Sequence, residues 1–114
     1  MRSVEDLLDS LITATEEGKL VWEQEPPKRY SASLPRHKIC VWQWTDDDDG
    51  SIGVTVQLLD RYGEVLDYAS ADQYKSAFGE LDKLHLAARR SALGVSNVIS
   101  EVEKELSALR RTGR

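Results

Sequence analysis

The chain has 114 residues, which is enough for one domain with a substantial core and too few for two domains of ordinary size. Its 20 acidic and 15 basic side chains give a net charge of −5 at neutral pH, which opposes nonspecific attraction to nucleic acid or to an anionic membrane. No stretch approaches the run of about 18 apolar residues that a membrane-spanning helix needs. We therefore expect neither a nucleic-acid partner nor a membrane partner.

The first predicted element is an amphipathic helix over residues 4 to 17. Ser3 and Asp6 have the spacing of a capping box, with Asp in place of the usual Glu. Gly18 stands where a residue in the left-handed conformation would end the helix. Apolar side chains recur at intervals of three and four residues, which defines the buried stripe. This stripe consists of Val4, Leu7, Leu8, Leu11 and Ile12.

Residues 20 to 22 predict a first strand directly after this helix. Residues 23 to 29 contain Pro26 and Pro27, which lack backbone donors, so we expect a stiff connection there instead of a paired strand. A proline-rich ligand for a partner's groove is the alternative, but the usual P-x-x-P spacing is absent. Residues 30 to 34 then alternate as a second short strand.

The centre of the predicted sheet is a hairpin formed by residues 38 to 44 and 52 to 60. Apolar residues recur at every second position in both segments, and an acidic turn with one glycine separates them. In the second segment one face is apolar and the other is polar or small. This alternation predicts a sheet with one face covered by helices. The apolar face of the second segment consists of Ile52, Val54, Val56 and Leu58.

The first segment of the hairpin is apolar on both faces. Ile39 and Val41 occupy one face, and Cys40, Trp42 and Trp44 occupy the other. The two tryptophans either fill the core or stand on the open face of the sheet. On an open face, rigid aromatic rings with a polar N–H would make good contacts for a partner. The sequence leaves both alternatives open.

One more turn and strand complete the predicted meander. Residues 60 to 63 have the composition of a turn, and residues 64 to 68 that of a returning strand. Ser70 and Gln73 repeat the capping-box spacing, which predicts that the second helix begins near residue 70. Gly94 should end this helix or kink it.

A third amphipathic helix is predicted from Ser96 to Leu109, and the basic residues 110 to 114 are expected to form a frayed tail. Residues 1 to 109 are thus predicted to form a single α+β domain. It would consist of an N-terminal helix, an antiparallel meander of four to five strands, and two C-terminal helices packed on one face of the sheet.

The acidic turn is the main candidate for ion binding. Asp46, Asp47, Asp48 and Asp49 place four carboxylates before Gly50. However, the spacing is not that of an EF-hand loop, and adjacent side chains alternate in direction instead of converging. A solvated turn is the favoured interpretation. Weak cation binding and an electrostatic contact with a basic partner are the alternatives.

Groups suited to catalysis are sparse. His85 lies within reach of Asp82 and Arg89 on the second predicted helix, which is the basis of an enzymatic alternative. No spacing brings Cys40 or a serine to His85, and neither a zinc pattern nor a glycine-rich phosphate loop is present. We therefore expect no enzymatic activity, no metal and no cofactor. Cys40, the only cysteine, is expected to be a small buried residue.

Three segments of the sequence carry a resemblance. They are Thr15-Glu16-Glu17-Gly18-Lys19-Leu20-Val21-Trp22 at the end of the first helix, Tyr30-x-Ala32-x-Leu34, and Val56-x-Leu58-Leu59-Asp60-x-x-Gly63-x-Val65. In these segments the chain resembles small uncharacterised proteins of bacteria and their phages. The resemblance implies a compact accessory domain, a class in which binding proteins and inhibitors are common. It carries over no catalytic residue.

The expected function is a non-enzymatic protein-interaction domain, with an acidic inhibitor or accessory protein and a homodimer as specific forms. The expected contacts with a partner are Trp22, Tyr30, Trp42 and Trp44, together with the acidic residues 46 to 49. The alternative is a module that binds a nucleotide or metabolite in a pocket between sheet and helices, lined by Trp22, Tyr30, Trp42 or Tyr68. Because no secretory segment is recognisable, we expect the protein in the cytoplasm.

Overall fold

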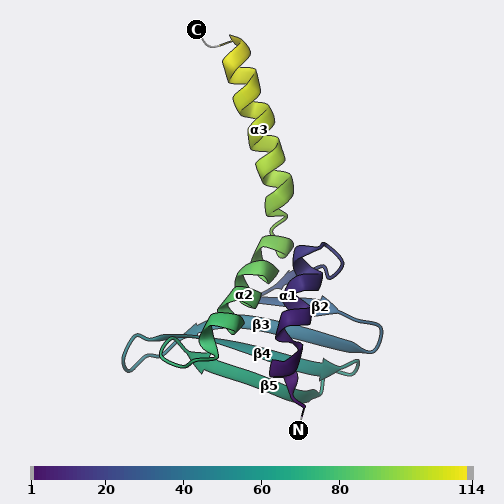
Figure 1. The fold of residues 1–114 in the computed structure, drawn as a ribbon, viewed down its shortest axis with the longest axis vertical. Helices are drawn as coiled ribbons and strands as arrows, with labels where there is room; N and C mark the ends of the chain where they lie inside the picture. Colours follow the sequence, from purple (N-terminus) through teal and green to yellow (C-terminus); the bar gives the residue numbers. More distant parts are fainter. Residues whose placement is uncertain (1, 113–114) are drawn as a thin grey trace.

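The computed structural model describes residues 2–112 and contains a five-stranded antiparallel sheet with helices on one face (Figure 1). In chain order the elements are η1 (a 3₁₀ helix, Val4–Leu7), α1 (Leu8–Glu16), β1 (Glu23–Glu25), β2 (Arg29–Ser33), β3 (His37–Thr45), β4 (Ile52–Asp60), β5 (Val65–Asp72), α2 (Phe78–Ala92) and α3 (Val95–Thr112). Neighbouring strands in the sheet are also neighbours in the sequence. The predicted α+β class and the predicted order of elements are confirmed.

The N-terminal helix begins and ends as its sequence predicts. The backbone N–H of Ser3 donates a hydrogen bond to Asp6 Oδ2 at 2.8 Å, so the aspartate does cap the first turn. At the other end Gly18 has a φ of +77°, a conformation that disfavours residues with a Cβ. The backbone N–H of Lys19 then donates to the carbonyl of Ala14 at 2.9 Å, which satisfies one of the last helical acceptors.

The core lies between the sheet and the layer formed by η1, α1 and α2. Val41 on β3 stands opposite Val56 on β4, and both side chains are fully buried. Burying one such side chain contributes about 1.5–3 kcal/mol. The helices contribute Val4, Leu8, Leu11, Ile12, Leu81, Leu84 and Ala88 to the same core. The apolar faces predicted for these strands and for the first helix meet in this core, except that Ile52, at the start of β4, is 39% exposed.

The first strand differs from the prediction. β1 begins after residues 20 to 22, and Pro26 and Pro27 lie in the turn that joins it to β2. The segment expected to be a stiff connection is therefore a short hairpin at the edge of the sheet. Trp22 does not pair with a strand because its backbone N–H donates to Ser91 Oγ on α2 at 3.1 Å and its ring is buried.

The start of the second helix also differs. β5 continues past Ser70, and α2 begins well after it. Ser70 Oγ lies 2.7 Å from Thr55 Oγ1 on β4. Gln73 pairs with Ile52, donating its backbone N–H to the carbonyl and accepting the Ile52 N–H on Oε1, at 2.8 and 2.7 Å. Because β4 uses both groups, neither Ser70 nor Gln73 caps a helix.

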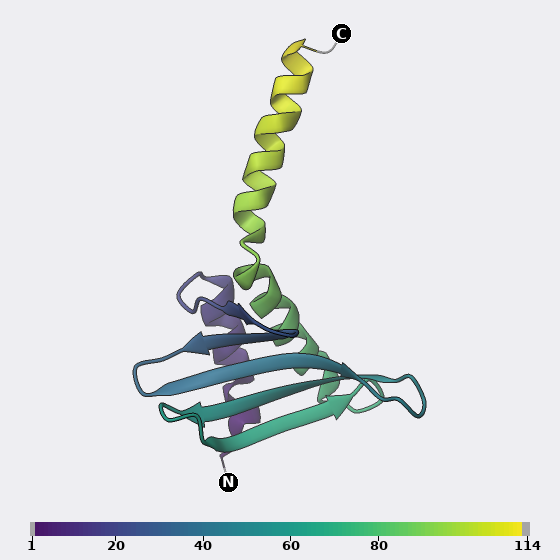
Figure 2. The same ribbon diagram turned by 180° about the vertical axis from the view of Figure 1, so that it is seen from behind.

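The two C-terminal helices occupy different positions. α2 packs across all five strands, whereas in the described part of the chain α3 contacts only α2. Between them Gly94 has a φ of +61°, and α3 projects away from the body of the molecule (Figures 1 and 2). The expectation that both helices pack on the sheet therefore applies to α2, while the glycine directs α3 elsewhere. Arg110 and Arg111, expected in a frayed tail, belong to α3; residues 113–114 lie outside the described residues.

Candidate interaction surfaces

The face of the sheet opposite the helices carries three aromatic side chains. Figure 2 views the sheet from this side, with α1 and α2 behind it. Trp42 and Trp44 lie on this face of β3, and Tyr68 lies on the same face of β5. The two tryptophans are half-buried, and Tyr68 is 65% exposed. We call these three residues the tryptophan face.

Trp44 lies flat against the backbone of the neighbouring strand. Its partner in the register of β4 is Gly53, and a Cβ atom on that glycine would overlap the indole ring. The indole N–H donates a hydrogen bond to Thr55 Oγ1 at 2.9 Å, and that hydroxyl is also bonded to Ser70. The backbone at Gly53 thus packs against one face of the ring, and the hydrogen bond to Thr55 fixes the edge that carries the N–H. The other face of the ring points toward solvent.

Trp42 is held by a different contact. Arg29 on β2 is its partner in the register, and the guanidinium carbon lies 4.1 Å from the centroid of the indole ring. A cation at this distance over a tryptophan ring is attracted by the π electrons. Because both rings are already oriented, a partner that contacts them would lose little side-chain entropy on binding.

The acidic turn follows β3. Asp48 N–H donates to Asp46 Oδ1, and Ser51 N–H donates to Asp49 Oδ1, each at 2.8 Å. Hydrogen bonds from Ser51 lower the pKa of Asp49 below its usual value. Asp47 and Asp48 are exposed. Over residues 2–112, no group of three or more His, Cys, Asp or Glu side chains is arranged to hold a metal ion.

The other two predicted contacts belong to the core. Trp22 is 2% exposed, and its indole N–H donates to Thr15 Oγ1 at 2.8 Å. Tyr30 is 7% exposed, and its ring centroid lies 5.7 Å from that of His85. Both residues, predicted as partner contacts, are buried in this structure and present little surface to a partner. Both are large aromatic residues in short segments, and the sequence gives no sign of which side of the sheet they face.

The predicted pocket between sheet and helices does not form from the predicted residues. Trp22 and Tyr30 lie on the helix side of the sheet, whereas Trp42 and Tyr68 lie on the open side. The sheet itself separates the two pairs. A ligand on either side could therefore contact only one pair.

Two reactive side chains are buried. His85 is 7% exposed, and its Nδ1 has no hydrogen-bond partner in the described part of the chain. Burial lowers the pKa of the imidazole, an effect that Asp82 opposes and Arg89 reinforces. Burial likewise raises the pKa of the Cys40 thiol, which disfavours the reactive thiolate. Cys40 is buried, as predicted.

α3 presents a second apolar surface. Its large apolar side chains are between 43% and 64% exposed, although their spacing is that of a buried stripe. They are Val98, Ile99, Val102, Leu106 and Leu109. The amphipathic pattern was recognisable in the sequence, but such a pattern does not say which element covers the stripe.

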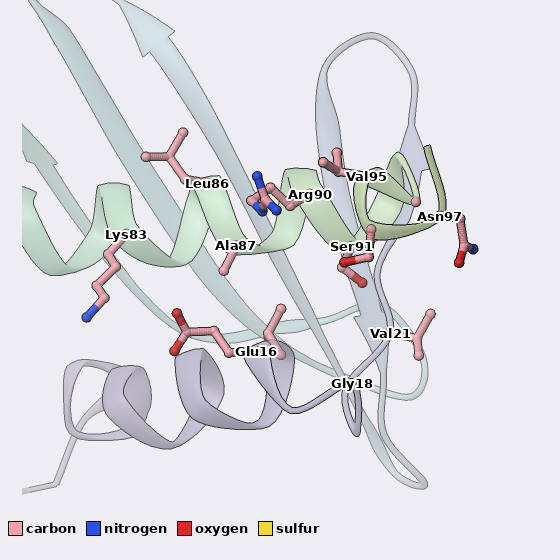
Figure 3. Close-up of a pocket in the computed structure, with 13 residues that line it drawn as sticks. Glu16, Gly18, Val21, Lys83, Leu86, Ala87, Arg90, Ser91, Val95 and Asn97 are labelled. Carbon is pink, nitrogen blue, oxygen red and sulfur yellow. The ribbon is translucent and has the colours of Figure 1, made fainter. Parts of the chain in front are cut away.

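Two grooves lie beside the helices. The larger, of about 540 Å³, is formed where α1, α2 and the start of α3 meet, and Figure 3 shows Glu16, Lys83 and Arg90 on its walls among apolar residues such as Val21. The smaller, of about 430 Å³, lies between α1 and the sheet. Its walls are mainly apolar and include Leu7, Leu11, Ala14, Leu20, Leu34, Ile39 and Leu58.

The comparisons with known proteins add no identification. No protein-family model, curated protein or solved structure matches the chain. Among the helices formed by residues 2–112, none combines the length and the apolar character needed to cross a bilayer.

Proposed function

We propose that the chain is a non-enzymatic protein-interaction domain that binds a protein partner on the tryptophan face. The observation that carries this proposal is the fixed position of Trp44, which lies over Gly53 and is hydrogen-bonded to Thr55 while part of its surface stays accessible. Tryptophan is among the residues that contribute most to protein interfaces, especially when it is well oriented before binding.

The charge beside the tryptophan face favours a basic partner. Asp72 on β5 and Trp44 on β3 lie opposite Gly53 from its two sides, and the acidic turn begins directly after β3. The whole chain carries a net charge of −5. An arginine side chain can stack on an indole ring and pair with a carboxylate at the same time. We infer that the partner presents an arginine-bearing segment to this face.

This chemistry is consistent with an accessory protein or inhibitor of bacterial or phage origin that acts on a basic protein surface. The resemblance described for the sequence supports the same class of function. A cytoplasmic location stays a prediction from the sequence.

The three tryptophans allow a direct test by NMR. Each indole N–H gives its own signal, so a titration reports on Trp22, Trp42 and Trp44 separately. The probe is a peptide that contains several arginines and aromatic residues, and the matched control is the same peptide with glutamate at each arginine. We expect the signals of Trp42 and Trp44 to shift with the basic peptide, that of Trp22 to stay in place, and the shifts to shrink at high salt.

Variants locate the site. We expect the double variant Trp42→Ser/Trp44→Ser to weaken binding of the peptide at least tenfold, because the main apolar contacts are removed (roughly 1–2 kcal/mol or more). The matched control is Tyr62→Ser, since Tyr62 is 80% exposed but lies in the turn between β4 and β5. Equal binding by the double variant, or equal binding of the glutamate peptide, would contradict the proposal.

A second candidate function is the binding of a small apolar molecule in the groove between α1 and the sheet. The observation that favours it is the apolar lining of a cavity of about 430 Å³, a size that suits a small ligand. The test is a thermal-unfolding screen with nucleotides and apolar metabolites. A ligand of this groove should raise the Tm of the natural chain but not that of Ala14→Phe, in which the groove is filled. An unchanged Tm across the screen would count against this function.

A further inference from the structure

α3 is a long helix with almost no support from the rest of the chain. It spans 18 residues, or about 27 Å, and among the helices and strands of residues 2–112 it contacts only α2. Most of the stability of helices in proteins comes from packing of an apolar stripe against another element. The stripe of α3 is exposed, so the described residues do not supply this packing.

The spacing of the stripe indicates what kind of partner fits. Counted from Val95, which is half-buried at the start of α3, apolar residues follow intervals of four, three, four and three, and Val98 lies outside this spacing. These intervals average 3.5 residues and match the seam of a coiled coil. We call these residues the α3 seam: Val95, Ile99, Val102, Leu106 and Leu109. Glu101, Lys104 and Ser107 lie on the opposite side of the helix.

We propose that the α3 seam pairs with the α3 seam of a second copy of this chain, with the two helices parallel and in register. A second copy provides an identical stripe with the same spacing, so every apolar layer of one helix meets its own counterpart. Such a pair covers the four seam residues that follow Val95, whose side chains are now between 43% and 64% exposed. The resulting assembly is a dimer with a two-fold axis along the paired helices.

The charges beside the α3 seam fit a parallel pair. Glu105 and Arg110 flank it five residues apart, which is the offset that brings oppositely charged residues together across a parallel coiled coil. In the dimer each Glu105 therefore meets Arg110 of the second copy. Within the described residues Arg110 makes no ion pair, so it is available for this contact.

An antiparallel pair fits less well. Matching Ile99 with Leu109 and Val102 with Leu106 places the two-fold axis near Lys104 and leaves Val95 without a counterpart. Glu103 and Glu105 would then each lie near their own copies, and like charges at such a position destabilise the pair. The charge pattern therefore favours the parallel arrangement.

The dimer would leave the tryptophan face free, because that face lies on the side of the sheet away from the helices, and α3 extends beyond the body (Figure 2). Two copies would then present two such faces. Bivalent binding of one partner is a consequence that rests on the proposed function, whereas the pairing of α3 does not depend on it.

The first test is the molar mass of the full chain, measured by sedimentation equilibrium over a range of concentrations. We expect a dimer that dissociates on dilution. Leu106→Lys places a charge in the middle of the α3 seam and should weaken the dimer at least about a hundredfold. The matched control Ser107→Lys adds the same charge one residue further, on the outer side of the helix, and should leave the dissociation constant within about twofold.

A charge reversal tests the direction of the helices. Arg110→Glu or Glu105→Arg alone should weaken the dimer about tenfold, since each replaces two attractive pairs per dimer with repulsive ones. The double variant Glu105→Arg/Arg110→Glu restores opposite charges only in a parallel pair. We expect its dissociation constant to return to within about threefold of the natural value.

Three results would overturn the proposal. They are a monomer at every concentration, a dimer that survives Leu106→Lys, and a dimer that is lost in Trp42→Ser/Trp44→Ser instead. A failure of the double charge reversal to restore the dimer would overturn the parallel direction. Circular dichroism checks that each variant keeps the folded body, which is expected because α3 contacts only α2.

Discussion

Trp22 and Trp44 lie on opposite sides of the sheet, and the indole N–H of each makes the same kind of hydrogen bond. Each donates its indole N–H to a threonine hydroxyl, at 2.8 Å to Thr15 and at 2.9 Å to Thr55. Trp22 is 2% exposed beneath the helices, whereas Trp44 is half-buried on the open face. The local hydrogen bond is therefore equivalent, and the surroundings of the two rings differ.

The comparison separates two roles of a tryptophan. For Trp22, neighbouring elements remove both faces of the ring from water, so the residue contributes to the stability of the fold. For Trp44, one face packs on Gly53 and the other stays accessible. The side chain is therefore held in one orientation and can still contact a partner. This difference predicts which substitutions change stability and which change the surface.

The largest expected effect comes from truncating each ring in turn. Trp22→Ala should lower the free energy of unfolding by about 3–5 kcal/mol, because it leaves a large cavity in the core. Trp44→Ala should cost less, about 1–2 kcal/mol, because part of its ring is already in water. Urea unfolding of both variants measures the two values. Equal losses would show that the open face is as much a part of the core as the covered one.

Gly53→Ala is expected to have the next largest effect, since its new Cβ would overlap the Trp44 ring. Forcing a methyl group into such a contact typically costs about 1–3 kcal/mol. We also expect the indole N–H signal of Trp44 to move and that of Trp22 to stay. The matched control is Gly79→Ala in α2, where nothing lies within 4 Å of the added Cβ. That change should stabilise the protein by up to about 1 kcal/mol through helix propensity. An unmoved Trp44 signal in Gly53→Ala would contradict the flat packing.

The two threonines give a finer test of the same comparison. Thr15→Val removes the only acceptor seen for the buried N–H of Trp22 in the described residues and should cost about 1–3 kcal/mol. Thr55→Val should cost less, under about 1 kcal/mol, because the part-buried N–H of Trp44 can turn to water. Unfolding in urea measures the difference between the variants. A larger loss for Thr55→Val would break the comparison.

Much of the fold could be predicted from the sequence because its signals are local. The period-two pattern of β3 and β4, the acidic turn, and the glycines at 18 and 94 each fix a local geometry regardless of what packs against it. The start of α2 could not be predicted in this way. Ser70 and Gln73 have the spacing of a helix cap, but β4 offers them partners that are remote in the sequence.

For the tryptophan face, the sequence left two alternatives open, a place in the core or a place on the open face of the sheet. Local patterns do not say which remote elements pack against a strand. Periodicity places Trp42 and Trp44 on one face of their strand, but it does not say whether helices cover that face. Trp22 shows the converse, since its extended neighbours suggest a strand while contacts with α1 and α2 bury it. Likewise the stripe of α3 is readable in the sequence, whereas its exposure follows from the direction that the chain takes after Gly94.

The smallest predicted effect is the pH dependence of stability that His85 causes. It reports how well water is excluded from the side of the sheet that the helices cover. His85 lies there against Tyr30, and burial lowers the pKa of its imidazole in the folded state from the ordinary value of 6.5. Above that value neither state binds the proton and stability is unaffected. As the pH falls below 6.5 the unfolded chain binds a proton more readily than the folded one, so the free energy of unfolding decreases. One proton limits this slope to about 1.4 kcal/mol for each pH unit.

Urea unfolding between pH 7.5 and 5.5 measures this slope, and His85→Gln provides the control because it keeps a polar side chain that does not titrate. We expect stability to fall toward pH 5.5 in the natural chain more steeply than in the variant, with the difference between them isolating His85 from His37. Parallel curves would mean that the imidazole is as well hydrated in the folded protein as in the unfolded one. Water would then reach the helix side of the sheet beside Tyr30, and the contrast between a dry side that holds Trp22 and a wet side that holds Trp44 would not stand.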